Sequence, residues 1–308
     1  MKLFKNRGDI YLSKSKTKGS KQAKILYSLL AFIVIFTVVF VVLLNQRYPT
    51  VADFFAQGEI TEQENTAVYD DVLPVIEGKT NFLIMETNDS EDVIHYLFLV
   101  QADKDNLAYK VSPLPVDMMI DDSSVSEIFA VGGSPAVQTK LSEYFGFEID
   151  YQAQFKTSSF VEFINKLGSF IYTSNSEIKF SGGEEDDKYS FHIQQGEQKL
   201  SGRDINNLIR YYSEEEKNYA AQSQLILSAL TGLFNEENYE NSEALFRLFV
   251  KSCNTDITVR DFENGKTALM VFCTKNTDIT VYSAVTEAQD GVITQNSVKE
   301  IKGYFSKQ

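Results

Sequence analysis

The sequence has little of several residue types that many folds and sites depend on. Among its 308 residues are no tryptophan, two cysteines and two histidines. Cys253 and Cys273 are too few for a disulfide-rich scaffold, and either one bridge or two packed thiols fits the sequence. Neither His95 nor His192 has a Cys or His partner at the spacing of a metal site. The residues therefore predict no metal site.

Arginine is absent from a long stretch of the chain, since none occurs between Arg47 and Arg203. Acidic residues outnumber basic ones by 43 to 29, for a net charge of −14. Residues 1–24 hold eight basic residues and one acid, which leaves −21 for the rest of the chain. Such an acidic domain does not attract the phosphate backbone, so we expect no nucleic-acid partner.

One long apolar run, residues 25–44, is present. Twenty helical residues extend about 30 Å, the thickness of the hydrocarbon core of a bilayer. A cleaved signal peptide would have a shorter apolar run and a small-residue cleavage site, which this sequence lacks. Because the basic residues precede the run, residues 1–24 are expected to form a cytoplasmic tail. We predict a single-pass protein of the cell membrane, held in the lipid bilayer, with an extracellular C-terminal domain.

The remaining residues are predicted to form a spacer and an α/β domain. Residues 45–77 are polar and acidic, which is typical of a juxtamembrane spacer. Short apolar runs predict strands, at residues 81–86, 93–100 and 106–114. Apolar residues at helical spacing predict helices, at residues 134–145, 157–167, 202–213, 216–234 and 241–251. From Asp256 onward, two short strands and a closing helix at 298–305 are expected. This mixture favours a three-layer α/β/α domain with a central mixed sheet.

Several short segments, in order, carry a resemblance to a known family. They are Met85–Asp89, Leu114–Asp117, Ala130–Gly133, Gly146–Tyr151, Phe160–Gly168, Gly196–Gly202 and Asn207–Tyr212. Their order and their residue patterns resemble those of the LytR-CpsA-Psr family, membrane-anchored proteins of mainly Gram-positive bacteria. The resemblance covers residues 80–232. On this basis residues 78–252 are expected to form the family's domain, and residues 253–308 a C-terminal extension of it.

The resemblance implies transfer of a glycopolymer from a polyprenyl pyrophosphate carrier to peptidoglycan. Displacement of pyrophosphate requires arginines and a divalent ion held by aspartates. The chain departs from that pattern at several positions. The aspartate and threonine of the family's Asp-Thr pair fall on His95 and Tyr96, one arginine falls on Val116, and another on Tyr212. No cofactor is therefore assured, and Mg²⁺ is expected only if the site is active.

Two residues of the family pattern are retained, Asp117 and Arg210, and these are the candidate catalytic residues. His95, Tyr212 and Arg203 are candidate binding residues. Simpler interpretations stay open: His95 packed between layers of the structure, and Asp117 as a turn residue after a proline.

Other features also have two interpretations. Arg210 could form a surface salt bridge with Glu214, four residues on. The acidic run at residues 182–188 is predicted to be a solvated hairpin tip and not a metal site. A stripe of aromatic side chains could line a tunnel for a polyprenyl tail, with core packing as the favoured alternative. The stripe comprises Phe160, Phe163, Phe170 and Tyr172.

The sequence thus predicts a divergent family member whose phosphotransferase site is degenerate. Whether the chain is an enzyme stays open. One alternative is an active ligase with a rebuilt site, which would bind a polyprenyl-pyrophosphate-linked glycan and peptidoglycan. The other is a noncatalytic scaffold or binding domain at the membrane.

Overall fold

The computed structural model describes residues 73–168, 170–183, 187–284, 286–289 and 291–307. The predicted cytoplasmic tail, membrane helix and most of the predicted spacer lie outside these ranges. Within them, no helix combines the length and the apolar character needed to cross a bilayer.

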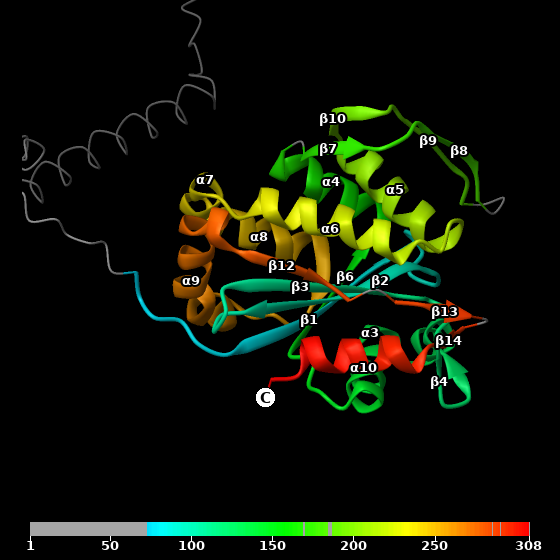
Figure 1. Cartoon of the computed structure of the whole chain (residues 1–308), viewed down its shortest axis with the longest axis horizontal. Coiled ribbons are helices and arrows are strands. Elements are labelled where there is room, and N and C mark those ends of the chain that lie inside the picture. The colour runs from blue at the N-terminus through cyan, green and yellow to red at the C-terminus, as the bar shows by residue number, and fades with distance from the viewer. Residues whose placement is uncertain (1–72, 169, 184–186, 285, 290, 308) are drawn as a thin grey trace, which may run out of the picture. The chain divides into compact units, whose positions relative to one another are not determined.

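A six-stranded mixed sheet lies at the centre of the domain (Figure 1), as predicted. Its strand order is β11-β6-β1-β2-β3-β12. The bounds are Lys79–Thr87 for β1, Ile94–Asp103 for β2, Ala108–Leu114 for β3, Tyr151–Lys156 for β6, Cys253–Thr255 for β11 and Thr280–Ser283 for β12. Strand β2 pairs antiparallel with β1 and β3, whereas β6 runs parallel to β1, and β12 parallel to β3. Residues after 252 therefore supply both edge strands of the sheet.

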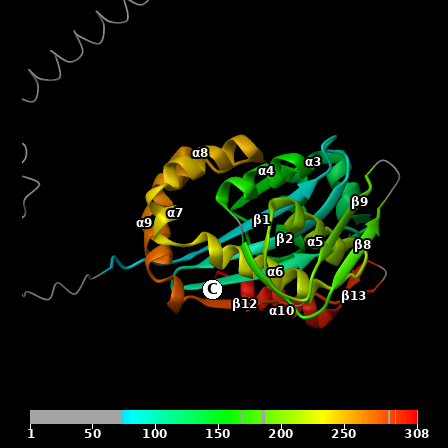
Figure 2. The ribbon, with the colours of Figure 1, turned by 90° about the horizontal axis from the view of Figure 1, so that it is seen from above.

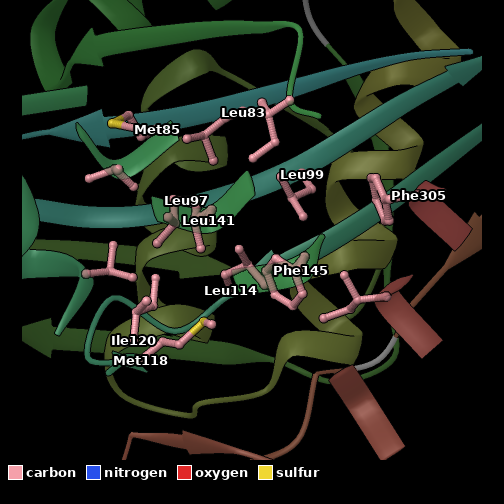
Figure 3. Close-up of a cluster of buried hydrophobic side chains, with 14 of the residues drawn as sticks. Leu83, Met85, Leu97, Leu99, Leu114, Met118, Ile120, Leu141, Phe145 and Phe305 are labelled. Atoms are coloured by element: carbon pink, nitrogen blue, oxygen red, sulfur yellow. The ribbon is translucent and has the colours of Figure 1, made fainter. Parts of the chain in front are cut away.

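Two helices, α3 (Val125–Phe145) and α10 (Gln295–Phe305), cover one face of the sheet. Their apolar side chains meet alternate residues of the central strands, such as Leu97 and Leu99 (Figure 3). Because the intervening residues of β2 are also buried, this strand is apolar on both sides. The predicted closing helix, 298–305, is the last part of α10.

Helix α3 begins earlier than predicted. Ser124 and Glu127 form a capping box that starts the helix nine residues before Ser134. Gly133, with φ of 65°, interrupts the helical backbone just before the predicted start. Gly146 ends the helix in the left-handed conformation, as its position in the sequence indicated.

The other face of the sheet carries four helices that the sequence predicted to within a few residues. They are α4 (Thr157–Leu167), α5 (Gly202–Glu214), α6 (Tyr219–Leu233) and α8 (Ser242–Ser252). Two antiparallel strand pairs lie beside α5 and α6. One joins β7 (Phe170–Ser174) with β10 (Gly196–Leu200), and the other is the hairpin of β8 (Ile178–Gly182) with β9 (Tyr189–Ile193), which lies between them in the chain. Figure 2 shows the β8–β9 hairpin at one end of the domain and α9 at the other.

The tail after residue 256 contains a helix that the sequence interpretation missed, α9 (Val259–Thr274). Short elements complete the chain: β4 (Met119–Ile120), β5 (Ser123–Ser124), α7 (Glu236–Glu240), a 3₁₀ turn η1 (Asn276–Asp278), β13 (Ala288–Gln289) and β14 (Val292–Ile293). Cys253 on β11 and Cys273 on α9 are both free thiols. The structure therefore has the two unbridged thiols and not the disulfide.

Candidate functional site

The candidate site is built where β1 ends and β2 begins. The two strands pair regularly through Glu86 and Tyr96, but the next pair is Thr87 with Ile94, so a β-bulge leaves His95 as the extra residue. Regular alternation would place His95 with Leu97 on the α3 side of the sheet. The bulge re-aims its side chain to the α5 side, where Glu86 also lies.

His95 is held between two carboxylates. Its Nδ1 is 2.8 Å from Oε2 of Glu86, and its Nε2 is 2.5 Å from Oδ2 of Asp187. The side chain of Glu86 is completely buried and also accepts a hydrogen bond from the hydroxyl of Thr157 at the start of α4. While both carboxyl groups are ionised, a ring with an acceptor at each nitrogen is satisfied as the doubly protonated imidazolium, the form that the raised pKa of His95 favours.

Arg210 completes the cluster from α5. A capping box of Ser201 and Asp204 starts this helix, and Arg210 lies two turns later with 4% of its surface exposed. Its Nη2 donates to Oδ2 of Asp187 at 2.9 Å, and its Nε donates to Oε1 of Glu214 at 3.1 Å. The guanidinium also lies 4.4 Å from the ring centre of Tyr189 on β9. The Glu214 salt bridge proposed from the sequence is present; its Arg210 side is buried and its Glu214 side is partly exposed.

The cluster holds more negative groups than positive ones, which disfavours binding of an anionic ligand. Three carboxylates, of Glu86, Asp187 and Glu214, face two cations, Arg210 and protonated His95. The six carboxylate oxygens all accept hydrogen bonds from side chains within the cluster. We infer a net charge near −1, so neither cation of the cluster is free to receive a phosphate group.

The shifts in pKa follow from burial and from these contacts. Burial raises the pKa of Glu86, an effect that its bonds to His95 only partly offset. Burial alone would lower the pKa of His95, but the hydrogen bond and the charge of Glu86 raise it. For Asp187, burial is outweighed by the hydrogen bond from Arg210, and its pKa is lowered. These directions keep His95 protonated above the usual pH range of a histidine.

The two candidate catalytic residues have different partners. Asp117 is exposed in the turn after β3, and its Oδ2 is 3.1 Å from Nζ of Lys217. Arg210 bonds instead to Asp187 and Glu214. The structure therefore brings Arg210 together with His95, through Asp187, but does not join either to Asp117.

The other candidate binding residues lie outside the charged cluster. Arg203 is exposed in the first turn of α5. Tyr212 is buried, with its hydroxyl 3.4 Å from the hydroxyl of Tyr172. Phe160 is buried in the core between the sheet and α5, and Phe163, Phe170 and Tyr172 pack against that core. The aromatic stripe thus packs as core, as the favoured interpretation held.

Sequence reasoning missed three acidic members of the cluster. Glu86 had one signal, because it is a lone carboxylate in the apolar run of β1. Asp187 was assigned to a solvated hairpin tip, but its carboxylate turns toward His95 and Arg210. Glu214 was considered only as a surface partner of Arg210.

The cluster does not fit the divalent ion that the resemblance implies. In the part of the chain that the structure describes, no group of three or more Asp, Glu, His or Cys side chains has the geometry of a metal site. The carboxylates that come nearest to such a set already bind Arg210, His95 and Thr157. A metal would have to displace those bonds, so the arrangement of this cluster does not support a reaction step through a metal ion.

Together the fold and the site define a class of protein: a three-layer α/β domain with a buried ionic cluster where β1 ends and β2 begins. A family model, LytR_cpsA_psr, matches residues 86–306, more than half of the chain. The chain belongs to this family.

Solved structures share the fold at low sequence identity. A protein described as a transcription regulator from Eubacterium siraeum is 18% identical, covering 78% of this chain and 96% of its own, with a TM-score of 0.65. TagV from B. subtilis is 13% identical, with coverages of 75% and 96% and a TM-score of 0.59. A structure of TagT bound to LI-WTA is also 13% identical, with coverages of 74% and 89% and a TM-score of 0.53. A search among curated proteins finds no significant match.

Proposed function

We propose that this chain is a single-pass membrane protein whose family domain acts outside the cell in cell-wall glycopolymer biogenesis, with a degenerate phosphotransferase site. Membership of the LytR_cpsA_psr family supports the role in glycopolymer biogenesis. The apolar run at residues 25–44, with basic residues before it, supports the anchor and its orientation.

One observation carries the degenerate site: the cations that would receive a phosphate are already neutralised by the protein. Arg210 donates to Asp187 and Glu214, and His95 lies between Glu86 and Asp187. A pyrophosphate would add at least two negative charges to a cluster that already carries an excess of one carboxylate. Opening these ion pairs costs at most about 3 kcal/mol for each partner removed, because Asp187 is 38% exposed and its pairs are partly screened by solvent, and a transferase site would have to recover this cost from its substrate.

The test is binding of farnesyl pyrophosphate to the full chain in nanodiscs of zwitterionic lipid, by calorimetry with and without Mg²⁺. Farnesol is the matched control, because it has the same apolar tail and no charge. TagT, measured in parallel, serves as a reference from the same fold. We expect Mg²⁺ to leave the affinity unchanged, and the pyrophosphate to bind no more tightly than the alcohol.

An active ligase would give a different result. If Mg²⁺ strengthens binding of the pyrophosphate, and Arg210→Ala removes that gain, the site is rebuilt and our proposal is wrong. The noncatalytic alternative is tested in cells, where a scaffold tolerates replacement of Asp117 and Arg210 together. A null phenotype from that folded double variant would count against a scaffold.

A further inference from the structure

A second candidate site lies between α8 and α9, away from the charged cluster. The groove between these helices encloses about 460 Å³ and is lined mainly by apolar side chains, with Phe246 and Val250 on α8 and Phe262 on α9. Val250 and Val259 are 42% and 68% exposed, so the groove presents apolar surface to solvent. The volume is within the range of small-molecule sites.

Two cations, Arg247 and Lys251, stand at the rim of this groove. Both are exposed, and they lie one helical turn apart on α8. Among the described residues, no carboxylate lies within salt-bridge distance of either; Glu243 is 2.8 Å from Lys266 instead. Glu263, on α9, is the rim carboxylate that remains. The rim therefore has a net charge of about +1 in an otherwise strongly acidic chain.

On the other side of Phe246 and Phe262 is a second pocket of about 400 Å³ between α9 and the sheet, which is partly open to solvent. Phe246, Ile257 and Phe262 line both spaces, and the first and last of these rings stack at 4.4 Å as a shared wall. Tyr109 of β3 lines the second pocket, is 2% exposed, and has a hydroxyl with no hydrogen-bond partner in the described part of the chain.

We propose that this groove binds a single-chain monoanionic amphiphile of the fatty-acid type. The carboxylate contacts Arg247 and Lys251, and the alkyl chain lies along the groove on Phe246, Val250 and Phe262. A monoanion fits because the rim has one net positive charge, whereas Glu263 would oppose a dianion. The unpaired cations beside an apolar groove of small-molecule size favour an anionic group with an apolar tail.

This site is independent of the ionic cluster and of the function proposed for it. On β1, Thr80 borders the second pocket and Glu86 belongs to the cluster. The two residues are six positions apart on the strand, about 20 Å at roughly 3.3 Å per position. Figures 1 and 2 show α9 and the β8–β9 hairpin at opposite ends of the domain. Binding in the groove can therefore succeed or fail irrespective of pyrophosphate binding near Arg210.

Photolabelling of the full chain in nanodiscs tests the proposal, with dodecanoate that carries a diazirine near its methyl end. Among peptides from residues 73–307, we expect the labelled ones to come from residues 242–274. Unlabelled dodecanoate is expected to compete about tenfold better than dodecanol, because the alcohol lacks the charge that pairs with Arg247 and Lys251. Labelling that is spread over the domain, or equal competition by the two compounds, would overturn the assignment.

Variants give a second measurement. The pair Arg247→Ala and Lys251→Ala should reduce labelling about tenfold. Its matched control, Lys299→Ala with Lys302→Ala, removes two exposed lysines from α10 on the opposite face of the sheet and should leave labelling unchanged. Val259→Asp tests the apolar wall at an exposed position and should also reduce labelling. If labelling persists in these variants, or if Val259→Asp instead dissociates a dimer, an amphiphile is not the occupant.

Discussion

His95 of β2 and Asp187 beside the β8–β9 hairpin are 92 residues apart in the chain, yet their side chains meet at 2.5 Å. This contact ties the hairpin to the sheet and closes one side of the ionic cluster. Because Glu86 accepts at the other ring nitrogen, both contacts are satisfied only while His95 carries two protons. Loss of the second proton from His95 therefore weakens its contact with Glu86 or with Asp187.

The first prediction concerns stability and pH. The folded-state pKa of His95 is raised above its usual value of 6.5, through the bond to Glu86 that outweighs burial. Its contribution to stability is thus complete below about pH 6.5 and is lost as the pH rises through the folded value. The lowered pKa of Asp187 acts only in acid, as the pH falls below 3.8. Urea unfolding between pH 6 and 9 should show a falling midpoint.

A matched pair of variants separates this effect from general alkaline instability. His95→Gln should abolish most of the slope between pH 6 and 9. His192→Gln removes the other histidine, which pairs with Glu177 on the surface, and should keep the slope of the parent protein. Equal slopes in the two variants would show that His95 does not hold the second proton.

The second prediction is energetic coupling between Arg210 and Asp187. Arg210→Met should lower the free energy of unfolding by about 3 kcal/mol, because two carboxylates lose a buried partner. A double-mutant cycle with Asp187→Asn should give a coupling energy of about 1–3 kcal/mol, measured by urea unfolding. The exposed pair of Lys140 and Glu143 is the control and should show little coupling. Similar coupling in both cycles would contradict a buried cluster.

The third prediction concerns how α5 is positioned. A Cβ at Gly202 would meet the backbone oxygen of Val161, so α5 could not keep its close approach to α4. Gly202→Ala should destabilise the domain by about 2 kcal/mol. At Gly265 on α9 a Cβ meets nothing, and Ala there should stabilise by up to about 1 kcal/mol. Thermal unfolding of the two variants should show Tm shifts of opposite sign; shifts of the same sign would mean that the contact at Gly202 is not limiting.

The fourth prediction concerns the thiols. Burial raises the pKa of Cys253 to about 12 and that of Cys273 to about 11. Both should react slowly with iodoacetamide at pH 8 in the folded protein and rapidly in urea. Ser176→Cys adds an exposed thiol as a control and should react at the rate of a free cysteine. Fast reaction of the native pair would show that this region opens readily.

The secondary structure was predictable where local signals agreed with the fold. Helix α5 had both a capping box and helical apolar spacing, and its predicted bounds differ by one residue. Local signals were misleading at the pentapeptide Thr-Asp-Ile-Thr-Val, which occurs twice in the chain. The first copy, residues 255–259, leads from β11 into α9, which begins at Val259, whereas the second copy, residues 277–281, leads into β12, which begins at Thr280. At the first copy, Thr258 caps the helix with Asp261; at the second, Ser283 stands where that acid would be.

The site was less predictable, because it depends on one bulge and one long-range contact. His95 was identified from its place in the family pattern, but its partners were not. Alternation along β2 points His95 to the wrong face, and only the bulge brings it to Glu86. A residue pair separated as widely as His95 and Asp187 leaves no signal in the spacing of the chain.

By itself the sequence determined the α/β class, the central sheet, most helices and the family, since these follow from periodicity, caps and an ordered set of motifs. The sequence alone also shows that arginine is scarce, and this scarcity restricts the chemistry of any phosphate site. The tertiary structure decided what the remaining charged residues do. Pairing of Arg210 and His95 with three carboxylates requires β1, β2, α5 and the β8–β9 hairpin to converge, and electrostatic contacts act through space between segments that the chain keeps far apart.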